Sequence, residues 1–359
     1  RRSGAAGRRG SERGRDVPPP SAFEVSLLAT LPAAHQTPLI RQILGSPSVA
    51  GARFNVGARS PWSPRETLER VAAEAERAGK RLWVDLKGRQ LRIVQWAVPT
   101  FGDIVLNHEI EVELPARIVF RGGESSEIVE VRGNRVFVDP PPANAVGQGQ
   151  AVNVHARRLE VKGYLTEEDE EYLDACASLG ILDVMLSFVE GPGDVEAVRN
   201  LLPGVRPVLK IESPAGLEFV RSAGPAGLAG CRLMAARDDL MVNLGGKPGG
   251  NPAEMLPALE ELVVLDPETI LASRVFQGVE QKGTPSLADF CDVRLMEALG
   301  YRTFLLSDGI CLRRFAEAAA AWEQYRAVTD RAVDHGPGTD GAGTHDVGTE
   351  RDRGGEAVG

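Results

Sequence analysis

Short apolar segments alternate with amphipathic helical patterns along most of the chain, and this alternation constrains the fold more than any other feature. The helical pattern opened by Ser63, Pro64 and Glu66 carries three helix-start signals, and Thr166 opens another. Eight strand–helix units with short connections predict an α/β fold of the (β/α)8 TIM-barrel class. The predicted strands are residues 23–31, 51–56, 82–85, 183–187, 206–211, 231–236, 269–273 and 303–307.

The alternation is interrupted once, after the third predicted strand. Residues 103–114 alternate in twos, and segments 128–131 and 135–139 flank a Gly-containing turn that is typical of a β-hairpin. We therefore expect a small all-β domain, residues 96–158, inserted into the barrel, where it could close over one rim as a lid.

The remaining boundaries follow from composition. The barrel is expected to comprise residues 21–95 and 159–327. Residues 1–20 form an Arg-rich segment with almost no apolar side chains, and residues 328–359 are rich in Gly, Asp and Thr, so both are expected to be disordered. The glycine-rich segment 245–250 lacks the spacing of a phosphate-binding loop and is expected to be flexible.

The bulk properties argue against several classes of partner. The net charge of −9 argues against a general nucleic-acid binder, and no apolar run is long enough to span a membrane. The cysteines lie far apart in apolar segments without Cys-x-x-Cys spacing, so we expect reduced core residues of a cytoplasmic protein. They are Cys176, Cys231, Cys291 and Cys311.

Polar side chains follow most of the predicted strands, at the end where a barrel carries its active site. Lys210 and Glu212 alternate on the fifth strand and so point the same way, while Asp239 follows the sixth. A lysine beside two carboxylates forms a site for a divalent cation and an anionic substrate, since Mg²⁺ favours hard oxygen ligands. Other strand ends supply Arg53, Asn55, Asp85, Arg92, Ser187, Asp238, Ser273 and Asp308.

Several segments, in order, resemble those of the pyruvate kinases over about residues 23–325. The run from Arg53 to Gly57 resembles the family's Arg-Leu-Asn-Phe-Ser-His, and Asp85-Leu-Lys-Gly-Arg-Gln-Leu-Arg92 resembles its Asp-Thr-Lys-Gly-Pro-Glu-Ile-Arg. The β insertion stands where the family has its mobile lid. Lys210-Ile-Glu212, Ala-Arg237-Asp-Asp239-Leu and the Pro285 segment resemble the family's catalytic strand, metal strand and Pro-Thr-Arg-Ala-Glu helix.

The resemblance implies Mg²⁺-dependent phosphoryl transfer between phosphoenolpyruvate, or a close analogue, and ADP, which yields pyruvate and ATP as in glycolysis. It is also compatible with a homodimer formed through the barrel. It implies that Lys210 stabilises the phosphoryl group, that Glu212 and Asp239 hold Mg²⁺ or Mn²⁺, and that Arg53 and Arg92 bind phosphate. In the same way it implies K⁺ at Asn55 and Asp85, and substrate contacts by Asp238 and Ser273.

Departures from the family pattern leave alternatives open. Asp238 replaces a glycine, Gly57-Ala58 replaces Ser-His and removes a K⁺ ligand, and Ser273 replaces a threonine. One alternative is a metal-dependent lyase or aldolase of the phosphoenolpyruvate/pyruvate-binding barrels, in which the same carboxylates hold a metal that stabilises an enolate. The other is a non-catalytic pyruvate kinase relative, which Asp238, Gly57 and Ala58 favour.

Overall fold

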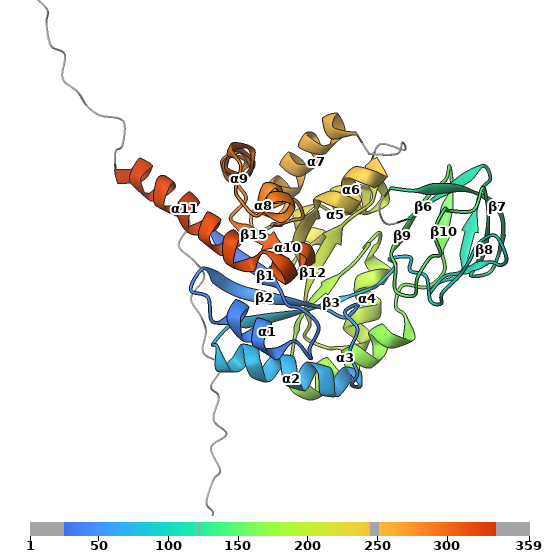
Figure 1. Ribbon diagram of the computed structural model, residues 1–359, viewed down its shortest axis with the longest axis horizontal. Coiled ribbons are helices and arrows are strands. Elements are labelled where there is room, and N and C mark those ends of the chain that lie inside the picture. Colours follow the sequence, from blue (N-terminus) through green and yellow to red (C-terminus); the bar gives the residue numbers. More distant parts are fainter. Residues whose placement is uncertain (1–24, 121–122, 245–250, 335–359) are drawn as a thin grey trace, which may run out of the picture.

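Eight parallel strands close into a barrel in the computed structural model, which describes residues 25–120, 123–244 and 251–334 (Figure 1). The strands follow the order β1-β15-β14-β13-β12-β11-β3-β2, and β1 pairs with β2, which closes the ring. The predicted TIM-barrel class is therefore confirmed. The barrel strands are β1 (Ser26–Thr30), β2 (Val49–Asn55), β3 (Arg81–Leu86), β11 (Asp183–Leu186), β12 (Arg206–Ile211), β13 (Arg232–Ala236), β14 (Ile270–Ala272) and β15 (Thr303–Leu306).

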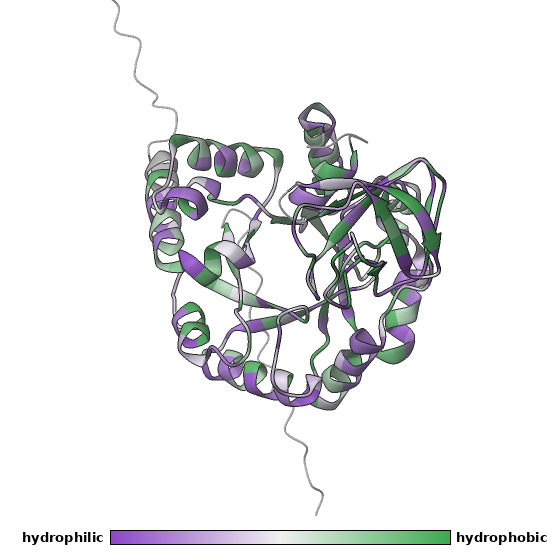
Figure 2. Ribbon diagram, turned by 45° about the vertical axis from the view of Figure 1, so that its right-hand side comes forward, coloured by the Kyte–Doolittle hydropathy of each residue, from purple (hydrophilic) through white to green (hydrophobic). Residues whose placement is uncertain are grey.

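Helices connect the strands and surround the barrel, and both hydrophobic and hydrophilic residues lie along them (Figure 2). The capping signals act as predicted, because Ser63 forms a capping box with Glu66 and Thr166 forms one with Asp169. The helices are α1 (Thr37–Leu44), α2 (Pro64–Arg77), α3 (Glu167–Leu179), α4 (Pro192–Leu201), α5 (Pro214–Gly227), α6 (Arg237–Leu244), α7 (Pro252–Leu265), α8 (Gln277–Lys282), α9 (Leu287–Leu299), α10 (Asp308–Arg313) and α11 (Phe315–Asp334).

The last helix of the described structure ends later than the sequence predicted. Helix α11 continues to Asp334, so it extends past the boundary at residue 328 that the sequence predicted. The predicted arm at 1–20, the remainder of the predicted tail and the glycine-rich segment 245–250 lie outside the described residues. No helix in the described ranges is both long enough and apolar enough to cross a membrane.

An all-β domain is inserted between β3 and α3, as predicted, and it projects from one side of the barrel (Figure 1). Its antiparallel five-stranded sheet has the order β4-β8-β7-β6-β9, and β10 pairs with β5. The predicted hairpin is β7–β8, whose turn contains Gly133 with a positive φ of 62°. The strands are β4 (Ile104–Val105), β5 (Ile110–Val112), β6 (Ala116–Phe120), β7 (Ser125–Arg132), β8 (Arg135–Asp139), β9 (Val152–His155) and β10 (Leu159–Val161).

The inserted domain has a hydrophobic core separate from the barrel cores. This core includes Leu91 and Ile93, and β10 ends at Val161, so the domain extends beyond the predicted limits of 96 and 158 at both ends. A large cluster packs the strands against the helices. A third cluster, which includes Trp83 and Met185, fills the barrel interior. Because the interior is filled, the space for a ligand lies at the strand ends.

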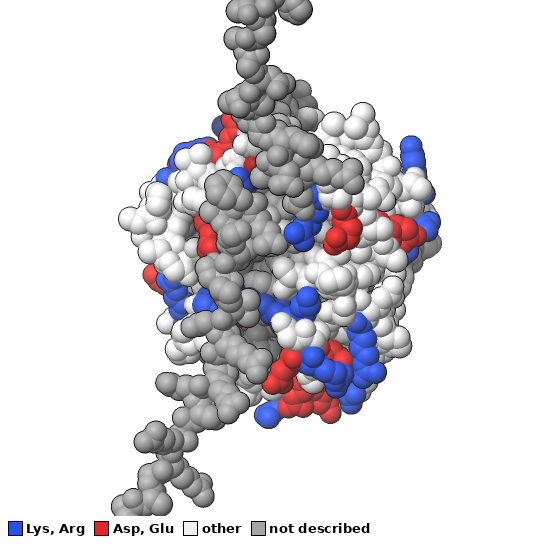
Figure 3. All heavy atoms as spheres, turned by 90° about the vertical axis from the view of Figure 1, so that its left-hand side faces the viewer, with Lys and Arg blue, Asp and Glu red and all other residues white. Residues whose placement is uncertain are grey.

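The cysteines are all unpaired, but not all belong to the core. Cys176 and Cys311 are buried as predicted, whereas Cys231 is partly exposed and Cys291 is exposed. Cys291 lies on α9 but outside the buried face of that helix. Its apolar neighbours in the sequence do not reveal that its side chain is exposed. Basic and acidic side chains are intermixed on the face shown in Figure 3.

Candidate active site

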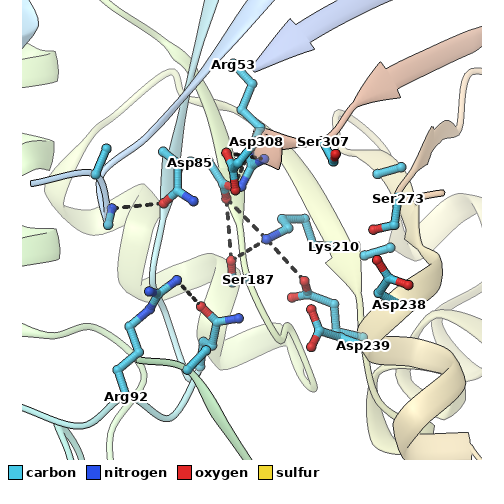
Figure 4. Close-up of a pocket in the computed structure, with 18 of the residues that line it drawn as sticks. Arg53, Asp85, Arg92, Ser187, Lys210, Asp238, Asp239, Ser273, Ser307 and Asp308 are labelled. Atoms are coloured by element: carbon cyan, nitrogen blue, oxygen red, sulfur yellow. Dashed lines mark hydrogen bonds and ion pairs between the residues drawn. The ribbon is translucent and has the colours of Figure 1, made fainter. Parts of the chain in front are cut away.

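A cavity of about 840 Å³ lies at the carboxyl ends of the barrel strands, and residues of the inserted domain, such as Phe120 and Asn153, also line it. Figure 4 shows the residues of its wall. Lys210 points toward its middle, with Asp85 and Ser187 on one side and Asp238 and Asp239 on the other. The cavity brings together every site residue predicted from the sequence: Arg53, Asn55, Asp85, Arg92, Lys210, Glu212, Asp238, Asp239 and Ser273. Their individual roles remain predictions.

Lys210 is buried and makes three polar contacts. Its Nζ donates to Ser187 Oγ at 2.7 Å and lies 3.1 Å from Glu212 Oε1 and 3.4 Å from Asp85 Oδ1. Burial acts to lower the pKa of Lys210, but Asp85 and Glu212 raise it above its ordinary value. The ammonium group therefore stays charged at neutral pH, in a place where water is largely excluded.

Arg53, which is partly buried, and the buried Asp85 form a second ion pair. Arg53 Nε donates to Asp85 Oδ2 at 2.6 Å, and Nη1 donates to Thr30 Oγ1 at 3.1 Å. Arg53 Nη1 also lies 3.5 Å from Asp308 at the cavity rim. Burial opposes ionisation of Asp85, but Lys210 and Arg53 lower its pKa below the ordinary value. Asp85 thus holds two cations in place.

Glu212 and Asp239 are the carboxylates predicted to hold a divalent cation. Burial raises the pKa of Glu212 to about 7; Lys210 opposes this shift, and Asp239 adds to it. Burial likewise raises the pKa of Asp239. A buried and a partly buried carboxylate that both resist ionisation are suitable ligands for a hard divalent cation, whose charge would favour their ionised forms. Within the described ranges no three metal-ligating side chains gather, so other ligands would come from substrate and water.

Arg92 connects the cavity to the inserted domain. Its Nη1 donates to the carbonyl of Gly149 at 2.9 Å, and its Nη2 donates to Gln90 Oε1. Its Nε is buried without a hydrogen-bond partner in the described structure. Burial lowers the pKa of Arg92, yet a guanidinium remains charged. The positive charge of Arg92, in the wall of the cavity, favours an anionic ligand.

The two predicted monovalent-cation ligands are engaged within the chain. Asn55 Oδ1 accepts the backbone N–H of Gly57 at 2.9 Å, and Asp85 is paired with Arg53 and Lys210. A Cβ added to Gly57 would stand 3.2 Å from Arg92 Nη1, so the guanidinium lies close to the place of the missing side chain. The charged side chains of Arg53, Lys210 and Arg92 therefore surround the predicted monovalent-cation ligands.

The opposite wall is formed by α6 and the segment after β14. Ser273 and Arg274 have φ values of 68° and 60°, which non-glycine residues adopt rarely. The Ser273 carbonyl accepts two hydrogen bonds from Arg237, whose guanidinium also pairs with Asp292. This contact holds the segment and places Ser273 in the cavity wall.

Several cavity residues were not assigned a role from the sequence. In the sequence Ser187 is only a polar residue at a strand end, yet its hydroxyl accepts from Lys210 and donates to the Leu86 carbonyl. Asp308 is likewise only a strand-end residue in the sequence, and it approaches Arg53. Asn153, on β9 of the inserted domain, also lines the cavity and acts to lower the pKa of Asp239. No sequence signal could place Asn153 there, because that depends on how the two domains pack.

Fold and site together define a (β/α)8 barrel with a β domain inserted after its third strand and a lysine–carboxylate cluster at its carboxyl rim. Similar proteins support a particular family, although no protein-family model matches the chain. The pyruvate kinase of Corynebacterium glutamicum is 26% identical over 259 residues, 70% of this chain and 48% of that protein. The pyruvate kinase of Mycobacterium tuberculosis is 24% identical over 286 residues, 77% of this chain and 54% of that protein.

A third match, the pyruvate kinase of Mycobacterium intracellulare, is 23% identical and covers 75% of this chain and 62% of that protein. The chain is therefore a divergent relative of the pyruvate kinases. It spans about half the length of the curated relatives that it matches.

Proposed function

We propose that the protein is a Mg²⁺-dependent phosphotransferase that transfers the phosphoryl group of phosphoenolpyruvate, or a close analogue, to ADP, giving pyruvate and ATP. The observation that carries this proposal is the buried Lys210 ammonium, held between Ser187, Asp85 and Glu212 beside the Asp239 carboxylate. Phosphoryl transfer needs positioning and positive charge around the moving group, with little covalent chemistry by the protein.

The residues of the cavity divide this task. Lys210 stabilises the negative charge of the phosphoryl group in transit, because its ammonium is fixed and desolvated. Arg53 and Arg92, which both line the cavity, bind phosphate oxygens from the other side. Glu212 and Asp239 would hold Mg²⁺, which when bound neutralises phosphate and enolate oxygens. The Ser273 hydroxyl is available to the substrate carboxylate.

An adjoining cavity supports a nucleotide as the acceptor. It measures about 1010 Å³ and shares Gly57, Ala58, Arg92, Gly149 and Gln150 with the first cavity. Lys87 lies in its wall and is paired there with Glu168, and Trp96 from the inserted domain is 69% exposed at its edge. The cationic side chains of Arg59 and Arg92 and the exposed aromatic ring suit a polyphosphate attached to a base. We propose that the inserted domain acts as a lid over both cavities.

The test is a coupled assay of pyruvate formation from phosphoenolpyruvate with ADP and Mg²⁺. Lys210→Met keeps the aliphatic stem but removes the charge, and we expect it to reduce kcat by about 10²- to 10³-fold or more. Lys282→Met, at an exposed position on α8, is the matched control and should not reduce it. Because Asp85 is already paired with Arg53 and Lys210, we expect the same rate with and without K⁺.

The same assay separates the alternatives. Pyruvate formation that requires ADP and Lys210 would support the phosphotransferase. Consumption of phosphoenolpyruvate without nucleotide would instead indicate a lyase or aldolase reaction. Binding without turnover under either condition would contradict the proposal and support a non-catalytic relative.

A further inference from the structure

Two neighbouring residues of α6 hold two neighbouring residues of the segment after β14. Arg237 donates from Nε and Nη2 to the Ser273 carbonyl, at 3.0 and 2.7 Å. In the reverse direction, Arg274 Nε donates to Asp238 Oδ1 at 2.5 Å. The two contacts form a reciprocal clamp between the ends of adjacent barrel strands β13 and β14.

The clamp fixes Arg274 on one side of Asp238. Arg274 has a positive φ of 60°, a conformation that persists where the surroundings determine it, and the buried Arg237 supplies that constraint next to it. Asp238 belongs to the cavity wall, whereas Arg274 does not. The Arg274 guanidinium therefore approaches the Asp238 carboxylate from outside the cavity.

The charges of the cavity wall show why this partner matters. Carboxylates outnumber cations, with Asp85, Glu212, Asp238, Asp239 and Asp308 facing Arg53, Arg92 and Lys210. Arg53 and Lys210 are already paired with Asp85, Asp308 and Glu212. Asp238 stands directly beside Asp239 in the chain, so an unpaired charge on Asp238 would attract a cation and repel an anion at the same place.

We propose that Arg274 is a specificity-determining residue: by neutralising Asp238 it lets an anionic substrate bind beside the Glu212–Asp239 cation site. The Asp238–Arg274 pair thus sets the balance between cation and anion binding in the cavity. This inference rests on the proposed function only in taking the substrate to be a phosphorylated carboxylate. It assigns a task to an aspartate that otherwise opposes such a substrate.

The experiment compares Arg274→Gln, Asp238→Asn and the double variant with the wild-type protein. Mn²⁺ affinity is measured by electron paramagnetic resonance without substrate, and phosphoenolpyruvate affinity is measured by calorimetry at saturating Mn²⁺. Because the side chains of Arg274 and Asp238 are 36% and 54% exposed, water screens the pair, and Arg274→Gln should tighten Mn²⁺ and weaken phosphoenolpyruvate by about two- to fivefold each. The double variant should return both affinities toward the wild-type values, because the charge that Arg274 masks is gone.

Arg232→Gln is the matched control, since it breaks an ion pair with Glu268 near the start of the strand that leads to α6. If Arg274 has only a structural role, Arg274→Gln should weaken the binding of both Mn²⁺ and phosphoenolpyruvate, and adding Asp238→Asn should not restore either affinity. That result would overturn the inference. Unchanged affinities for both ligands would overturn it as well. If the wild type does not bind phosphoenolpyruvate, the proposed function fails, while the Mn²⁺ measurements still decide the role of the ion pair.

Discussion

At the residue scale, the cavity is a balance of buried charges rather than a row of independent groups. Asp85 holds Arg53 and Lys210, and Lys210 in turn contacts Glu212. Ionisation is unfavourable for Glu212 in particular, since burial raises its pKa to about 7. A buried carboxylate in this state costs stability when it ionises, and a bound cation offsets that cost.

Glu212 gives a pH dependence of stability. Its folded pKa of about 7 lies above the ordinary 4.5, so its contribution is fully present below pH 4.5 and is lost as the pH rises through 7. Between pH 5 and 8 without divalent cations, the wild-type protein should lose up to about 3 kcal/mol relative to Glu212→Gln. Urea unfolding at several pH values measures this difference.

Saturating Mg²⁺ is the control for that experiment, because a cation on the ionised carboxylate should flatten the wild-type profile. Parallel wild-type and Glu212→Gln profiles in the absence of cations would contradict the raised pKa of Glu212.

Residue types at strand ends could be predicted from the sequence, but their partners could not. Alternation along β12 places Lys210 and Glu212 on one face, and both line the cavity. The ion pair of Asp238 with Arg274 joins two different strand ends, and the backbone of Arg274 has a rare conformation. Pattern and propensity carry no information about such a contact.

At the element scale, the loop after β3 is positioned by a helix cap. Asp169 closes the capping box of α3 and also accepts the backbone N–H groups of Lys87 and Gly88, at 2.8 and 3.1 Å. It is fully buried. The sequence predicted the cap from Thr166, but the attachment to the β3 loop arises only from tertiary packing.

This dual use predicts unequal effects of two similar substitutions. Asp169→Asn cannot accept from all its donors, so it should lower the free energy of unfolding by about 1–3 kcal/mol. Glu66→Gln, in the exposed capping box of α2, should cost less than about 1 kcal/mol. Urea denaturation of both variants tests the comparison, and equal costs would show that the loop does not depend on Asp169.

At the scale of the whole molecule, the two domains have separate cores, and the cavity lies where they meet. Arg92 and Asn153 reach the cavity from the inserted domain, whereas Lys210 and Glu212 belong to the barrel. The order of strands and the place of the insertion could be predicted from sequence periodicity. The domain limits could not be predicted in this way. Leu91 and Ile93 follow closely after barrel strand β3 in the sequence, yet their side chains pack in the core of the inserted domain.

Separate cores predict separate stabilities. Ile118 is fully buried in the inserted domain, and Ile118→Ala should destabilise it by about 2–5 kcal/mol. Hydrogen exchange should then accelerate in β6 and β7 while β12 keeps its protection. Leu209→Ala, in the barrel core, is the converse control. Uniform acceleration throughout the molecule would show that the two domains unfold as one unit.

The insertion also has a consequence for synthesis. Leu86 of β3 pairs with Leu186 of β11, and Leu27 of β1 pairs with Phe304 of β15. In both pairs the second strand is synthesised long after the first. A ribosome adds about 5–20 residues per second, so β3 emerges about 5–20 s before its neighbour. During that interval the nascent three-stranded sheet exposes two unpaired edges, which are surfaces for chaperones or for aggregation. Early folding of the inserted domain would shorten the distance that the chain must bridge to complete the ring.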